Sequence, residues 1–114
     1  MYHSDIQLLR HIFDEIAFIE SEVKVLNENT FLHDAKSQRA FARSLEIIGE
    51  AVKNISEDTI SRNPSIEWRK IAGMRDKLIH GYFSVNYKLV WDVVKNFIPN
   101  LKTQLETINL DGKA

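Results

Sequence analysis

The sequence predicts an all-α protein, folded as an up-and-down bundle of about four helices. Apolar residues recur at steps of three and four along most of the chain, which is the spacing of one face of a helix. No stretch shows the sustained alternation of apolar and polar residues that a half-buried strand would need. Polar residues that typically begin or end helices separate the apolar stripes, so short connections should join neighbouring helices.

Length and charge limit what the protein can be. The 114 residues suit one domain with one core, and we expect residues 1–114 to form it. With 15 basic and 16 acidic residues the chain is not a polycation, so any contact with nucleic acid must come from a local patch. The absence of cysteine excludes disulfide scaffolds and thiolate chemistry. No signal peptide and no membrane span are visible, so we expect a cytoplasmic location with no membrane contact.

The first helix should run from about Asp5 to Leu26. Ser4 and Gln7 have the spacing of a capping box at its start. The polar run 27–30 should end it, with Phe31 and Leu32 packed at the end of the bundle. Its apolar stripe comprises Ile6, Leu9, Phe13, Ile16 and Val23, widened by Leu8, Ile12 and Ile19.

The second helix should begin after Asp34, which is a good N-cap. Gly49 in its middle costs about 1 kcal/mol relative to Ala, which suggests the close approach of another helix. Its apolar stripe is Phe41, Leu45, Ile48, Val52 and Ile55. Beside that stripe runs a polar one, which could be either part of a site or an ordinary solvated face. It comprises Arg39, Arg43, Glu46, Glu50 and Lys53.

The remaining chain predicts two further helical segments after a polar connection at residues 56–65. Ser65 is the expected N-cap of the third helix, and Gly73 could divide that helix in two. Asn86 should cap the last helix, whose apolar residues keep steps of three and four to residue 108. Pro99 falls inside that stripe and should bend or interrupt the helix, because proline lacks a backbone donor.

The richest chemistry of the sequence lies in residues 75–82. Counted as helix, Arg75 and Tyr82 share a face, and Asp76 is four residues before His80. Arginine binds phosphate through two donors and histidine can move protons near neutral pH. Together they suit RNA cleavage in which the neighbouring 2′-hydroxyl attacks the phosphate. The alternative is a helix end with a surface arginine and a capping histidine.

The charge around this segment is locally positive. Between residues 62 and 77 the basic side chains outnumber the acidic ones, and Arg69, Lys70 and Lys77 are the candidates for RNA binding. The same pattern also fits an ordinary charged helix surface. The four histidines are scattered without His-x-x-x-His spacing, so we expect no metal site and no cofactor.

Arg75-x-x-x-x-His80 followed by Gly81-Tyr82 resembles the Arg-x-x-x-x-His-x-Tyr signature of HEPN-domain proteins, specifically of HepT-type toxins. The resemblance extends to residues 43–53, which are similar to the second helix of that family, and to residues 64–75, which lead into the motif. Val85-Asn86 with Val90-Trp91 resembles the start of its last helix, where Asp would be expected in place of Asn86.

This resemblance implies a homodimeric, metal-independent endoribonuclease toxin. A nucleotidyltransferase antitoxin of the MNT type would neutralise it by attaching AMP to Tyr82, while Arg75 and His80 would be catalytic. Asp76 would orient the site, and Arg43 and Glu50 would be semi-buried partners beneath it. The alternative is a non-catalytic dimer of the same fold that binds RNA, a nucleotide or a partner nucleotidyltransferase.

Overall fold

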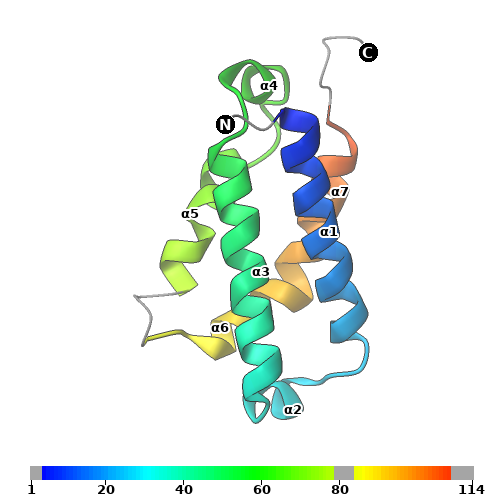
Figure 1. Cartoon of the computed structure of the whole chain (residues 1–114), viewed down its shortest axis with the longest axis vertical. Helices are drawn as coiled ribbons and strands as arrows, with labels where there is room; N and C mark the ends of the chain where they lie inside the picture. Colours follow the sequence, from blue (N-terminus) through cyan, green and yellow to red (C-terminus); the bar gives the residue numbers. More distant parts are fainter. Residues whose placement is uncertain (1–3, 79–83, 109–114) are drawn as a thin grey trace.

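The computed structural model describes residues 4–78 and 84–108, and in these residues the prediction of an all-α up-and-down bundle is confirmed. Helices α1 (Asp5–Val23), α3 (Ala35–Lys53) and α5 (Trp68–Leu78) form three rods of the bundle (Figure 1). The last rod joins α6 (Tyr87–Asp92), the π-helical η1 (Val93–Phe97) and α7 (Ile98–Glu106). Short helices α2 (Glu28–Leu32) and α4 (Glu57–Arg62) lie at opposite ends of the bundle (Figure 1).

Helix α1 begins where its capping box predicts, but it buries a different face. Ser4 Oγ accepts from the Gln7 backbone N–H at 3.2 Å, and Gln7 Oε1 accepts from the Ser4 N–H at 2.9 Å. Ile6 is 56% exposed, so the expected stripe was wrong at its first residue. Because α1 packs on α3 and also on η1 and α7, the buried face is centred on other residues. Those residues are Leu8, Leu9, Ile12, Ile16 and Ile19.

The polar run 27–30 is not a plain turn, because it contains the start of α2. Asn27 Oδ1 accepts from the Thr30 N–H, and Thr30 Oγ1 accepts from the Asn27 N–H, each at 2.9 Å. These reciprocal bonds form a second capping box. Phe31 is fully buried as expected, stacked on Phe41 at a ring-centroid distance of 5.3 Å and packed against Trp91 at 5.4 Å.

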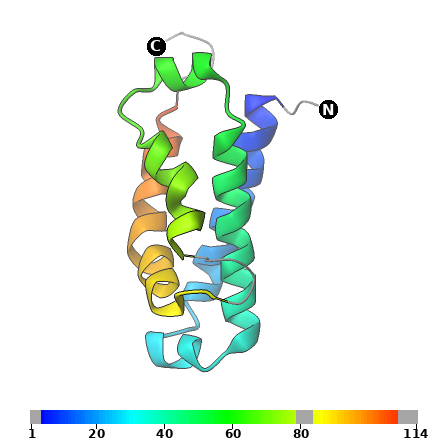
Figure 2. The ribbon, with the colours of Figure 1, turned by 90° about the vertical axis from the view of Figure 1, so that its left-hand side faces the viewer.

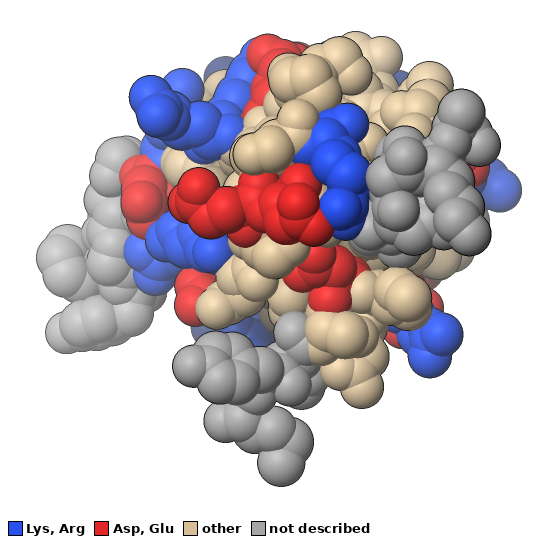
Figure 3. All heavy atoms as spheres, turned by 90° about the horizontal axis from the view of Figure 1, so that it is seen from above, with Lys and Arg blue, Asp and Glu red and all other residues tan. Residues whose placement is uncertain are grey.

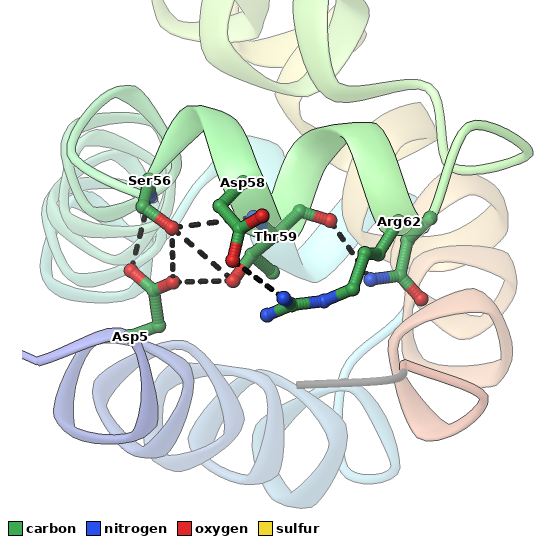
Figure 4. Close-up of polar contacts among 6 residues, drawn as sticks. Asp5, Ser56, Asp58, Thr59 and Arg62 are labelled. Atoms are coloured by element: carbon green, nitrogen blue, oxygen red, sulfur yellow. Dashed lines mark hydrogen bonds and ion pairs between the residues drawn. The ribbon is translucent and has the colours of Figure 1, made fainter. Parts of the chain in front are cut away.

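The expected polar connection at residues 56–65 also contains a helix, α4, which a contact with α1 holds in place. The Asp5 carboxylate accepts hydrogen bonds from the Ser56 backbone N–H at 3.0 Å, from Ser56 Oγ at 2.6 Å and from Thr59 Oγ1 (Figure 4). Burial alone would raise the pKa of Asp5, but these hydrogen bonds outweigh it and lower the pKa. The first turn of α4 is thereby tied to the first turn of α1.

Helix α5 is continuous from Trp68 to Leu78, so Gly73 does not divide it. It also starts later than Ser65 predicts, because residues 64–66 form a turn. The indole Nε1 of Trp68 donates to the Asn63 carbonyl at 2.9 Å, and Ile66 is only 4% exposed. The turn is therefore packed against the core, and helix α5 begins after the turn, at Trp68.

The last rod begins at Asn86, whose side chain accepts from the Leu89 N–H at 3.1 Å, as predicted. The expected disturbance near Pro99 is the π-helical η1, where the Ile98 N–H bonds to the Val93 carbonyl. The wider turn falls directly before the proline, which cannot donate to the preceding turn. Among the residues described, no helix is both long enough and apolar enough to span a membrane.

Candidate active site

An open hollow of about 500 Å³ lies over the polar face of α3, between α1 and α5. We call it the Arg75 hollow. Figure 2 shows α5 running alongside α3, and residues of both helices line the hollow. Three basic and three acidic side chains line the hollow: Arg43, Lys53, Arg75, Glu46, Glu50 and Asp76. Charges of both signs are thus concentrated over one seam between two helices.

Gly49 allows α5 to approach α3 at this seam. Gly49 is buried, and a Cβ placed on it would lie 3.5 Å from the Ala72 carbonyl oxygen and 3.6 Å from the Cβ of Arg75. The close helix approach expected from this glycine is confirmed. The backbone segment that carries Arg75 therefore lies directly against the middle of α3.

The guanidinium of Arg75 lies between two carboxylates. Its Nε is 3.9 Å from Glu46 Oε2, and its Nη1 donates a long hydrogen bond of 3.4 Å to Asp76 Oδ1. Arg75 is 38% exposed, so this cation still faces solvent and could meet an anionic ligand. The contact with Asp76 agrees with an orienting role for that residue. Glu46 was missed as a site residue, although it belongs to the polar stripe that the sequence displays.

Arg43 and Glu50 line the same hollow, but both are exposed. The expectation that they would be semi-buried beneath the site was therefore wrong. The polar face of α3 looks into an open hollow and is not covered by another helix. The acid of α3 that pairs with Arg75 is Glu46, one turn before Glu50 on the helix.

None of the three candidate RNA-binding residues of α5 lines the Arg75 hollow itself. Lys77 lines an apolar hollow between α5, α6 and η1, whereas Arg69 lines a second hollow above the α3–α5 seam. Lys70 borders both of these and is engaged, since its Nζ lies 3.8 Å from Glu67 Oε2 and 5.3 Å from the centre of the Phe97 ring.

His80 and Tyr82 lie outside the described residues. On either side of their segment, the Asn86 backbone N–H donates to the Leu78 carbonyl at 2.9 Å. Residues 78 and 86 therefore meet at the C-terminal end of α5, whose last turn also carries Arg75. The described part of the predicted motif, residues 75–78, thus lies at the end of the helix that lines the Arg75 hollow.

At the end of the bundle that carries α4, far from the C-terminal end of α5, acidic and basic side chains occupy separate areas of the surface (Figure 1 and Figure 3). Figure 3 looks onto the end that carries α4, and acidic side chains gather in the middle of this face with basic ones beside them. Glu57 and Asp58 form the acidic first turn of α4. A polyanion would be repelled from the middle of this end. In residues 4–78 and 84–108, no group of three or more His, Asp or Glu side chains could hold a metal ion.

Comparison with known proteins identifies relatives of this chain. The family model described as ribonuclease HepT-like matches residues 12–108. A relative from Caldanaerobacter subterraneus subsp. tengcongensis, named "Putative RNase", is 46% identical over 100 residues, which are 88% of this chain and 89% of the relative. A "Probable ribonuclease HepT" from Thermococcus cleftensis is 44% identical over 108 residues, 95% of this chain and 98% of the relative.

A further relative named "Putative RNase", from Methanocaldococcus jannaschii, is 44% identical over 103 residues, 88% of this chain and 85% of the relative. No solved structure matches the chain at comparable significance. The helical bundle and these matches define the class of protein as an α-helical ribonuclease. Within that class, the chain belongs to the ribonuclease HepT-like family, which confirms the resemblance seen in its sequence.

Proposed function

We propose that this protein is a metal-independent endoribonuclease toxin, that it cleaves RNA with Arg75 and His80, and that it does so in a cleft shared by two copies of the chain. The observation that carries the proposal is the setting of Arg75. It is a half-exposed cation in a polar hollow, paired at 3.9 Å with Glu46 and at 3.4 Å with Asp76. Membership of a ribonuclease family supports the same activity.

The reaction that suits these side chains is attack by the 2′-hydroxyl on the adjacent phosphorus. A base takes the 2′-hydroxyl proton, the O2′–P bond forms, and the P–O5′ bond breaks. The departing O5′ takes up a proton, which leaves a 2′,3′-cyclic phosphate and a 5′-hydroxyl. His80 would move protons, and Arg75 would bind the phosphate oxygens as negative charge develops on them. One chain carries one such histidine, and a two-fold dimer would bring two.

Support for the dimer comes from an apolar hollow on the other side of α5. It holds about 210 Å³, and its apolar lining includes Met74, Leu78, Leu89, Val93 and Phe97. Leu89 is 38% exposed, so the apolar lining of this hollow is open at the surface and could be covered by a second copy of the chain. Light scattering at micromolar concentration should find a dimer, and Leu89→Glu should shift it toward monomer. A monomeric wild type would contradict the shared cleft.

Control by a partner follows from the family resemblance. We infer that an MNT-type nucleotidyltransferase transfers AMP from ATP to Tyr82. The phenol would give up its proton to a base, its oxygen would attack the α-phosphorus, and pyrophosphate would leave. The added phosphate would carry negative charge close in sequence to Arg75, and the adenosine would occupy space needed by RNA. Inhibition would then require no unfolding.

The test of the proposal is cleavage by purified protein. Wild type, Arg75→Ala and His80→Ala should be incubated with single-stranded RNA, and the fragments should be resolved by size. We expect cleavage by wild type and none by either variant, with unchanged helical circular dichroism. Lys36→Gln is the matched control, because Lys36 is an exposed α3 residue outside the hollows. Wild type that binds RNA without cutting it would instead support a non-catalytic dimer.

A further inference from the structure

A second hollow of about 560 Å³ adjoins the Arg75 hollow. We call it the flanking hollow. Lys53 and Ala72 line both hollows, so the two lie next to each other along the α3–α5 seam. Arg69 lines the flanking hollow on the α5 side, six residues and about 9 Å along the helix axis from Arg75. A ligand held by Arg75 could therefore extend over Lys53 toward Arg69.

The lining of the flanking hollow combines three cations and one acid, Glu67, with an apolar floor. Lys53 and Arg69 are both exposed, and neither has an ion pair within 4.0 Å among the described residues. The floor includes Ile60, Ile66 and Trp68, and the Trp68 ring is held by its hydrogen bond to the Asn63 carbonyl. This combination suits the two parts of a nucleotide. The base can pack on the apolar floor while the phosphate binds the two unpaired cations.

We propose that the flanking hollow is a subsite for the nucleotide next to the cleaved bond of single-stranded RNA, with its phosphate on Lys53 and Arg69. This inference rests on the proposed ribonuclease activity. The base must be unstacked to reach an apolar floor, so a paired duplex would not fit. Beyond the flanking hollow, the negative charge of Glu57 and Asp58 in the first turn of α4 would repel the RNA strand. The subsite should therefore hold a short flank of the strand.

The subsite separates the basic residues of α5 into two groups. Arg69 faces the same path as Lys53 and Arg75, whereas Lys77 lies in the apolar hollow on the other side of α5. Lys70 is engaged with Glu67 and Phe97 and is less available to RNA. Lys53, which belongs to the polar stripe of α3, takes the place of Lys77 as an RNA-contacting lysine.

The first test measures binding independently of cleavage. Fluorescence anisotropy with a labelled single-stranded RNA should compare His80→Ala protein with the same protein carrying Lys53→Gln and Arg69→Gln. The two substitutions should raise Kd several-fold and lower the slope of log Kd against log salt by about 0.7, the change for one lost phosphate contact on a single strand. His80→Ala protein carrying Lys36→Gln, which removes one exposed positive charge elsewhere on α3, should leave the slope unchanged. An unchanged slope in the double variant, or an equal change with Lys36→Gln, overturns the inference.

The second test concerns the base. RNAs with a single abasic residue at each position in turn should lose affinity at one position beside the cleaved bond, and a uniform or absent loss overturns the subsite. In the active protein, Lys53→Gln with Arg69→Gln should raise KM and leave kcat unchanged. Wild type that fails to cleave yet shows these binding effects contradicts only the ribonuclease proposal. Wild type that cleaves, with a double variant indistinguishable from it, contradicts only the subsite.

Discussion

Arg75 and Glu46 form an ion pair between two helices, with Arg75 Nε 3.9 Å from Glu46 Oε2. Glu46 comes from α3 and Arg75 from the last turn of α5, so the direction of the guanidinium depends on how these helices pack. Both side chains are more than one-third exposed, which makes the pair worth at most about 1 kcal/mol of stability. We therefore expect the ion pair to affect the orientation of the Arg75 side chain more than the stability of the fold.

We therefore expect Glu46→Gln to lower kcat for RNA cleavage by about tenfold, equivalent to about 1.4 kcal/mol, with little change in thermal stability. The neutral side chain keeps the shape but no longer holds the cation in one direction. Glu46→Asp should recover part of the rate. Glu106→Gln, an exposed acid of α7, is the control of equal charge change. Equal rates for wild type and Glu46→Gln would rule out a positioning role.

Gly49→Ala should be tolerated and should stabilise the fold by up to about 1 kcal/mol. The new Cβ would meet the Ala72 carbonyl oxygen at 3.5 Å and Arg75 Cβ at 3.6 Å, which are ordinary contact distances. Gly49→Leu should destabilise the protein and lower cleavage, because a larger side chain would push α5 away from α3. Urea unfolding measures both. A destabilised Gly49→Ala would show that the seam is tighter than these distances indicate.

Asp5 should make the stability of the fold dependent on acid pH. Its pKa is lowered in the folded state by hydrogen bonds from Ser56 and Thr59, which outweigh burial. The stabilisation is therefore fully present above the ordinary Asp pKa of 3.8 and is lost as the pH falls through the folded value. Asp5→Asn should cost about 1 kcal/mol at neutral pH and flatten this acid dependence.

Urea unfolding at a series of pH values checks this expectation, with Asp14→Asn on the same helix as the control. Some acid dependence should remain in Asp5→Asn, since hydrogen bonds from Ser37 also lower the pKa of Asp34. An Asp5→Asn variant with wild-type stability at neutral pH would show that the contact between α1 and α4 contributes little.

Tyr82→Phe should keep much of the ribonuclease activity and escape modification, because the phenol oxygen is the proposed acceptor of AMP and takes no part in proton transfer. Both forms should be incubated with the nucleotidyltransferase and ATP, followed by intact mass measurement and an RNA cleavage assay. Wild type should gain one adenylate and lose activity. If Tyr82→Phe gains the same mass and is equally silenced, the acceptor is another residue.

Local patterns in the sequence predicted most helix starts. The features that the sequence did not predict depend on contacts between residues far apart in the chain. The caps at Ser4, Asp34 and Asn86 were foreseen because each uses a hydrogen bond three residues away. Helix α4 was missed because part of its support comes from Asp5, 51 residues before Ser56. The exposure of Ile6 was missed because the buried face of α1 depends on the helices that pack beside it.

For the candidate site, the sequence identified neighbouring residues but not the contacts between helices. The sequence identified Arg75 and Asp76, which the structure brings into contact, but spacing along α3 could not say which acid of the polar stripe meets a residue of α5. Glu46 proved to be that acid, and Arg43 and Glu50 proved to be exposed. The roles of His80 and Tyr82 remain predictions from the sequence.

The chemistry assigned to Arg75 and His80 is tested most directly by the ends of the RNA that the purified protein produces in EDTA. Mass spectrometry of the fragments should find a 2′,3′-cyclic phosphate, or the monophosphate formed by its hydrolysis, together with a 5′-hydroxyl. Cleavage should proceed at the same rate with and without the chelator. Fragments carrying a 5′-phosphate and a 3′-hydroxyl, or cleavage that stops in EDTA and returns with magnesium, would contradict this account.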